Sequence, residues 1–171
     1  MNLEERFEQR LETKKRESML QVLFKCSRLL NEYAIGLMRE RTGYPVRAAH
    51  TTLFPHIDLA GTRLTVLADR LGVSKQAVGQ LVNELEDIGM LERRPDPSDG
   101  RARLVCFSED GKKGLFQGLA LLKELEGQVE KHIGTSHMDG LRAGLDAVMA
   151  NINKMTGMEI HPGQKDNENG G

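Results

Sequence analysis

Residues 93–105 read RRPDPSDGRARLV and gather four arginines around two aspartates, a local net charge of +2. Guanidinium groups bind phosphate oxygens and the acceptor edge of guanine, so this stretch could contact a nucleic acid. A calcium loop starting at Asp96 would need an oxygen ligand at position 100 and a glutamate at position 107. Those positions hold Gly100 and Phe107, which excludes a loop of that kind. Two interpretations of this stretch remain: an ordinary exposed turn, and a basic loop that contacts a binding partner.

A second stretch of interest covers residues 64–85 and reads LTVLADRLGVSKQAVGQLVNEL. Its pattern fits two short helices that cross steeply at a tight turn. Ala68 is small enough for close helix contact, and Gly72 four residues later can adopt the positive φ of the turn. Ser74 is a good N-cap for the second helix. We expect the inward side chains to be apolar: Leu64, Leu67, Leu71, Val73, Val78, Leu81 and Leu85.

The outward face of this second helix is polar and mostly uncharged. It consists of Lys75, Gln76, Gly79, Gln80 and Asn83. Glutamine and asparagine amides can bind adenine bidentately in the major groove. A glycine in mid-helix costs ~1 kcal/mol relative to alanine. Either a close approach to DNA or tight internal packing would explain Gly79, and a solvated polar surface is the alternative for the whole face.

The elements that position these stretches follow from apolar spacing and capping residues. The spacing predicts one long helix, or two in series, over residues 3–42, ended by Gly43 and Pro45. It also predicts helices over 46–57, 65–72 and 74–88, and strands over 90–94 and 101–107. A helix begins after Ser108, Gly134 interrupts, and Ser136 opens the last helix. The tail, residues 157–171, is expected to be disordered.

The composition fits a soluble protein but does not indicate which partners it binds. The chain has 171 residues, is 39% hydrophobic and 29% charged, and carries a net charge of −1. No apolar run is long enough for a membrane span, and the start does not resemble a secretory signal. Two distant cysteines indicate a reduced, cytoplasmic protein. No paired nucleophile and base, no carboxylate pair and no phosphate-binding glycine loop is recognisable, so we expect neither an enzyme nor a cofactor.

The helices at both ends carry wide apolar stripes that a small middle module cannot bury by itself. They can pack together as an extra lobe of a monomer or pair with a second chain. Because helices from both termini often combine in this way between two copies, we favour a homodimer. The expected domains are a dimerisation helix region at 1–45, a DNA-binding domain at 46–108, dimerisation helices at 109–156 and the tail at 157–171.

The order of these elements resembles that of the MarR (multiple antibiotic resistance regulator) family of winged helix-turn-helix repressors. The most specific part is the run from Leu64 to Gly111, which includes the DPSDGRARLV hairpin. The resemblance covers about residues 20–155. It implies a mainly α fold with a small β-hairpin wing and a homodimer that binds a pseudo-palindrome in double-stranded DNA. It also implies a repressor that a small-molecule effector releases.

The resemblance further implies roles for individual residues. Lys75, Gln76, Gln80 and Asn83 would face bases or phosphates. Ser74 would cap the recognition helix near a phosphate, and Thr65 would do the same one helix earlier. Arg101 would be the wing-tip arginine in the minor groove, with Asp99 at the tip to orient it. Arg94 and Arg103 would flank the wing.

Other polar clusters have weaker interpretations. His50, His56 and Asp58 do not share one helix face, so we expect no metal site, and the two histidines are weak candidates for effector contacts. Cys26 is interpreted as a packed structural cysteine; a thiol-based redox-sensing regulator that uses Cys26 is an alternative. A winged helix that binds an acidic protein through its arginines is another, although the Gln and Asn face fits base edges better than carboxylates.

Overall fold

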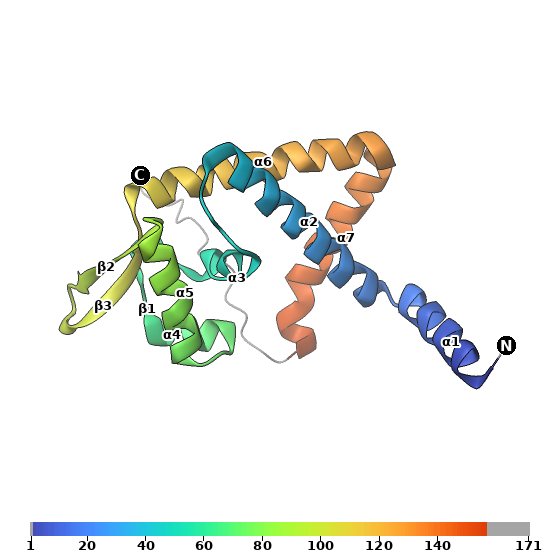
Figure 1. Ribbon diagram of the computed structural model, residues 1–171, viewed down its shortest axis with the longest axis horizontal. Coiled ribbons are helices and arrows are strands. Elements are labelled where there is room, and N and C mark those ends of the chain that lie inside the picture. Colours follow the sequence, from blue (N-terminus) through green and yellow to red (C-terminus); the bar gives the residue numbers. More distant parts are fainter. Residues whose placement is uncertain (1, 157–171) are drawn as a thin grey trace. The chain divides into compact units, whose positions relative to one another are not determined.

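The computed structural model describes residues 2–156 (Figure 1). The chain divides into two units, Met1–Gly43 and Tyr44–Gly171, each of which is described by itself. The expected disorder of the tail concerns residues outside the described part. Within the described residues, no helix is both long and apolar enough to cross a membrane.

The first unit consists of two helices in series, α1 (Leu3–Glu17) and α2 (Met19–Thr42). Ser18 separates them because its backbone is extended, and its hydroxyl accepts a hydrogen bond from the Gln21 N–H at 3.4 Å. Gly43 ends α2 with a φ of 73°, a left-handed conformation that favours glycine. The two-helix alternative is therefore the correct one for residues 3–42.

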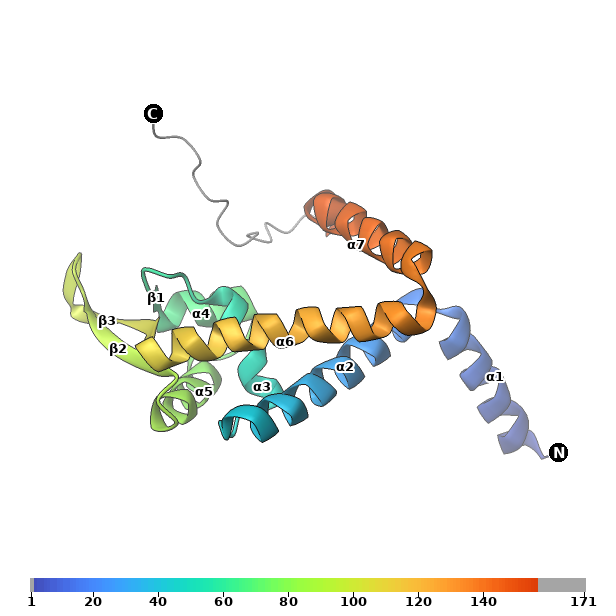
Figure 2. The same cartoon turned by 90° about the horizontal axis from the view of Figure 1, so that it is seen from above.

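The second unit begins with α3 (Ala48–Thr51), a 3₁₀ turn η1 (Phe54–His56) and a short strand β1 (Thr62–Arg63). The helix-turn-helix follows as α4 (Leu64–Leu71) and α5 (Lys75–Asp87), and the wing as β2 (Leu91–Asp96) and β3 (Asp99–Phe107). Helices α6 (Glu109–Ile133) and α7 (Thr135–Thr156) complete the unit, and Figure 2 shows α7 turning back from the end of α6.

The predicted mainly α fold with a small hairpin wing is confirmed, with three local corrections. The expected helix over 46–57 is only a four-residue helix and a 3₁₀ turn, because Pro55 disfavours the α conformation of the residue before it. β1 was not expected; it pairs with β3 through Thr62 and Val105, so the sheet has the antiparallel order β1-β3-β2. The last helix begins at Thr135 rather than Ser136.

The core of the second unit lies under the helix-turn-helix and the sheet. Its fully buried side chains are Leu53, Leu67, Val78, Val82, Leu85 and Val105. Leu64, Leu71 and Leu81 pack partly buried against them, as the apolar pattern predicts. Val73 was expected to face inward but is 47% exposed, and Val82 takes the buried position on α5, four residues after Val78. This core holds α5 with its polar face exposed.

Candidate nucleic-acid interface

The junction between α4 and α5 has the geometry that its residue types predict. Ala68 is 6% exposed and lies at the contact between the helices. Gly72 has a φ of 64° and allows the tight turn. The Ser74 hydroxyl caps α5 by accepting a hydrogen bond from the Ala77 N–H at 3.2 Å. These three local features fix the direction in which α5 leaves the turn.

Thr65 does not cap α4. The helix starts at Leu64, directly after strand β1, so its N-cap is Arg63, which makes no side-chain capping bond. Thr65 is instead an exposed residue within the first turn of α4. The expected capping role is therefore wrong, because pairing of β1 with β3 moves the helix start one residue earlier.

The outward face of α5 is exposed as predicted, at Lys75, Gln76, Gln80 and Asn83. Gly79 lies in the middle of this face, and the structure tests one of its two explanations, tight packing within the chain. A Cβ atom at position 79 would meet only the Leu64 side chain, at 3.8 Å, which is ordinary van der Waals contact. Packing within the chain therefore does not require glycine here.

The wing turns at a different place from the expected one. Asp96 pairs with Asp99, so the two-residue turn is Pro97–Ser98, and Asp99 and Gly100 belong to β3 rather than to the tip. The Asp96 carboxylate closes the turn by accepting hydrogen bonds from the Ser98 N–H at 2.8 Å and from its hydroxyl at 2.6 Å. The Asp-Gly pair is a hairpin signal, but this side-chain turn takes precedence over it.

Arg101 lies in an irregular part of β3. Pro95 pairs with Arg103 while the next residue, Asp96, pairs with Asp99, so residues 100–102 bulge out of the ladder. Arg101 and Arg103 are both exposed, whereas Ala102 and Leu104 are half-buried and Cys106 is buried. The end of the strand does not alternate, because Val105, Cys106 and Phe107 are all buried. In both views the hairpin projects from the helices behind it (Figures 1 and 2).

The acids of the wing are held by an arginine that sequence reasoning missed. The Arg63 Nε atom donates to the Asp96 carboxylate at 2.6 Å, and the Arg63 guanidinium lies 3.7 Å from Asp99. Asp96 is 6% exposed, and bonds from Ser98, together with Arg63, lower its pKa to about 2. Arg63 is 33 residues away in sequence, and no local signal connects it with the wing.

Asp99 contacts Arg101 through the backbone. Its carboxylate accepts a hydrogen bond from the Arg101 N–H at 3.1 Å and does not pair with the guanidinium in the described structure. Arg94 is occupied by Glu92, with 2.6 Å between Nε and the carboxylate. The side chains of Lys75, Arg101 and Arg103 have no carboxylate partner among residues 2–156. One end of α5 and the wing therefore carry uncompensated positive charge.

Two amides of the polar face are held by neighbouring side chains. The Gln80 Nε2 group donates to Glu84 at 3.2 Å, and the Arg93 guanidinium donates to the Asn83 carbonyl at 2.8 Å. Arg93 also pairs with Glu86. Asn83 therefore has only its NH₂ group free until Arg93 moves, whereas Gln80 keeps its carbonyl oxygen and one N–H hydrogen.

Glu84 is the centre of the larger network. His50, with a side chain only 3% exposed, places its Nε2 atom 2.8 Å from the Glu84 carboxylate, and Arg47 pairs with the same oxygen. Hydrogen bonds from His50 and then from Arg47 lower the pKa of Glu84 to about 2. The carboxylate is therefore ionised at neutral pH, with its charge balanced locally.

The cluster of His50, His56 and Asp58 is separated by the fold. His50 faces Glu84, whereas Asp58 binds Thr62 at 3.1 Å and Arg70 at 3.0 Å. Among the residues that the structure describes, no three His, Cys, Asp or Glu side chains gather in a way that could hold a metal ion. Both ring nitrogens of His50 are already bonded, which argues against a contact with an effector.

The two cysteines lie in opposite environments. Cys26 is exposed in the single chain, so its interpretation as a packed residue requires a partner surface to cover it. Cys106 is buried, and burial raises the pKa of its thiol. Its Sγ atom would lie 2.5 Å from a Cβ atom at position 61, so Gly61 leaves room for the sulfur.

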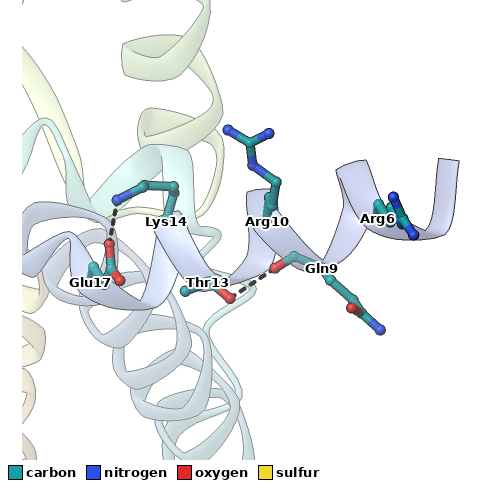
Figure 3. A pocket seen from close by; sticks show the side chains of 6 residues that line it. All are labelled: Arg6, Gln9, Arg10, Thr13, Lys14 and Glu17. Atoms are coloured by element: carbon teal, nitrogen blue, oxygen red, sulfur yellow. Dashed lines mark hydrogen bonds and ion pairs between the residues drawn. The ribbon is translucent and has the colours of Figure 1, made fainter. Parts of the chain in front are cut away.

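A further polar surface lies on α1 and is not a cleft between elements. Figure 3 shows its six side chains, which all come from this one helix, with Lys14 bonded to Glu17 and Thr13 bonded to the Gln9 carbonyl. It is therefore an open helix face, and it does not contribute to the interface.

The tight helix pair and the three-stranded hairpin sheet define a winged helix-turn-helix protein. Residues 49–102, which contain the helix-turn-helix and most of the wing, match the model of the MarR family. No curated protein sequence matches the chain. The family and the fold together support a DNA-binding transcriptional regulator.

Solved structures share this fold at low sequence identity. A crystal structure of MarR is 18% identical with a TM-score of 0.64, over 81% of this chain and 100% of that one. RV1404 from Mycobacterium tuberculosis is 20% identical with a TM-score of 0.62, over 81% and 92%. MepR, a transcription regulator of the Staphylococcus aureus multidrug efflux pump MepA, is 14% identical with a TM-score of 0.60, over 79% and 98%.

Proposed function

We propose that this chain is a sequence-specific DNA-binding regulator that inserts α5 into the major groove and places the β2–β3 wing at the adjacent minor groove. The observation that carries the proposal is the free positive charge of Lys75, Arg101 and Arg103, at the start of α5 and on the wing. Arg63, Arg93 and Arg94 nearby are paired with carboxylates of the chain. Unpaired cations at these two places can replace the counterions of the DNA backbone.

The polar face of α5 supports base readout in addition to phosphate contact. Gln76, Gln80 and Asn83 are exposed. The amides of Gln76 and Gln80 have the donor and acceptor groups that adenine edges require, whereas Asn83 offers its NH₂ group. Two of the three acids of the same helix, Glu84 and Glu86, are paired with His50, Arg47 and Arg93, and the third, Asp87, is the last residue of the helix. Ser74 brings the capped start of α5 to the same side, where a phosphate would be favoured.

We further propose that the regulator acts as a homodimer. In the single chain, both terminal regions keep large apolar side chains exposed, among them Phe7, Phe24, Phe116 and Leu119. Large exposed apolar side chains in this number favour an interaction surface in each region, and a second copy would supply the same surfaces with two-fold symmetry. Two half-sites about one helical turn apart would then be bound together.

We further propose that the protein represses transcription and that a small-molecule effector releases it from DNA. Both proposals are supported by the family and by MepR, whose name records regulation of a multidrug efflux pump. A cytoplasmic location would follow from regulation of transcription, and such a function needs neither an enzymatic reaction nor a cofactor.

Arg101→Ala tests the wing assignment. We expect weaker binding to all DNA sequences and a salt dependence reduced by about one phosphate contact, a change of roughly 0.9 in the slope of log K against log salt. Gel shifts with genomic fragments at several salt concentrations measure both. Lys123→Ala, which removes an exposed charge from α6, is the control and should change neither.

An Arg101→Ala protein with the affinity and salt slope of the wild type would contradict the wing assignment. A wild-type protein that retains an acidic protein but shifts no DNA fragment would favour the protein-interaction module instead.

A further inference from the structure

A chain of hydrogen bonds connects the start of α3, through the buried side chain of His50, with the amide of Gln80 on the recognition helix. The Arg47 N–H lies 3.2 Å from His50 Nδ1, and His50 Nε2 lies 2.8 Å from one oxygen of Glu84. The other oxygen of Glu84 accepts from Gln80 Nε2 at 3.2 Å. Two of these bonds join residues three or four apart, whereas the bond between His50 and Glu84 spans 34 residues. The proposed readout of DNA does not require such a chain.

The backbone determines the state of the histidine. A backbone N–H can only donate, so His50 Nδ1 must be its acceptor and carries no proton. The proton of the neutral ring is therefore on Nε2, from which it donates to Glu84. Because the His50 side chain is only 3% exposed, water does not compete effectively for this bond.

Glu84 in turn determines how the Gln80 amide is turned. An ionised carboxylate only accepts hydrogen bonds, so it binds the NH₂ end of the amide and would repel the carbonyl end. The carbonyl oxygen and the second N–H hydrogen of Gln80 then remain for a base. This donor and acceptor match adenine N7 and N6 in a single orientation.

We propose that Glu84 is a positioning residue for base recognition: held by His50 and Arg47, it fixes the orientation of the Gln80 amide and so sets the base preference at one position of the binding site. The inference rests on the proposed function, because it assumes that Gln80 faces a base. It adds a specificity determinant that does not itself touch DNA.

Selection of bound sequences from random DNA tests this inference. Gln80→Ala first identifies the base position that Gln80 reads, by a loss of preference of about 5- to 150-fold, the range of one bidentate contact. Glu84→Gln keeps the shape of residue 84, but its carbonyl oxygen accepts from His50 and Arg47, so its NH₂ group faces residue 80. The Gln80 amide must then turn its carbonyl oxygen toward residue 84 and loses the orientation that matches adenine. We expect the preference at that same position to fall toward onefold.

Two substitutions of His50 form a matched pair. The amide of His50→Gln can reach the place of Nε2 and donate to Glu84, whereas the amide of His50→Asn reaches only the place of Nδ1. We expect His50→Gln to keep the base preference and His50→Asn to lose it. In a Gln80→Ala background, Glu84→Gln should change the preference no further, because its effect passes through Gln80.

Several results would overturn the inference. One is an unchanged preference in Glu84→Gln, and another is equal preference in the two His50 variants. A uniform gain of affinity for all sequences in Glu84→Gln would show an effect of charge alone and would also overturn it. Thermal unfolding verifies that each variant folds; if His50→Asn does not fold, Glu84→Gln decides. Wild-type protein without any sequence preference would overturn the proposed function itself.

Discussion

Gly79 is placed where one substitution should act in opposite directions on stability and on DNA binding. Its Cβ position is open except for Leu64 at 3.8 Å, and its φ is not in the left-handed region. Gly79→Ala therefore adds a methyl group without strain. The intrinsic helix preference of alanine should raise the free energy of unfolding by ~0.8–1.0 kcal/mol. For a chain of this size that corresponds to about 2–4 °C in Tm.

DNA binding should weaken in the same variant. Gly79 lies between Gln76 and Gln80 on the exposed face of α5, where a methyl group would hold the helix away from the floor of the groove. Loss of one bidentate base contact, at ~1–3 kcal/mol, would lower the affinity by at least about fivefold. Fluorescence anisotropy with a selected DNA site and thermal unfolding by circular dichroism measure the two effects on one sample.

Gly118→Ala is the matched control, because Gly118 is also a helical glycine with nothing within 4 Å of its Cβ position, but lies on α6. It should gain similar stability without loss of affinity. A Gly79→Ala protein with raised Tm and wild-type affinity would refute the close approach of this residue to DNA. A lowered Tm would refute the packing argument.

Two further substitutions test the wing and its junction with α6. Gly111→Ala would place a Cβ atom 1.9 Å from the Met90 carbonyl oxygen, so the backbone must move. We expect thermal unfolding to show that the free energy of unfolding falls by about 1–3 kcal/mol, opposite in sign to the effect of Gly118→Ala. A higher Tm would contradict this. Asp96→Asn should change the acid dependence of stability. The pKa of Asp96 is lowered from 3.8 to about 2, so its ionised form stabilises the fold above pH ~4, and this contribution is lost as the pH falls toward 2. We expect Tm in the variant to fall less steeply over that interval, and an identical slope would show that the carboxylate does not stabilise the fold.

Much of the interface could be predicted because its signals are local. The positive φ of Gly72, the cap by Ser74 and the apolar positions of α4 and α5 depend on residues a few places apart. The exposed face with Gln76 and Gln80 follows from the same helical periodicity. The hairpin and the cap of α6 at Ser108 were predicted for the same reason, and two helices in series were one of the two alternatives for residues 3–42.

Two predictions were wrong where another contact overrode the preference of a residue type, one of them close in sequence and one remote. Asp99 and Gly100 suggest a turn, but the side chain of Asp96 closes the turn two residues earlier. Thr65 is a good capping residue, but the pairing of β1 with β3 sets the start of α4. In both places the structure depends on a contact that cannot be predicted from the turn or capping preference of a single residue.

The sequence by itself determined which residues make the helix-turn-helix, which face of α5 is polar and where the arginines of the wing stand. Only the tertiary structure decided which of the charged groups remain free. Arg63 pairs with Asp96 across 33 residues and His50 bonds to Glu84 across 34, while Arg101 has no carboxylate partner among the described residues. The physical reason is that charge and amide orientation depend on distances of about 3 Å between side chains, and such distances exist only after strands and helices remote in sequence have packed together.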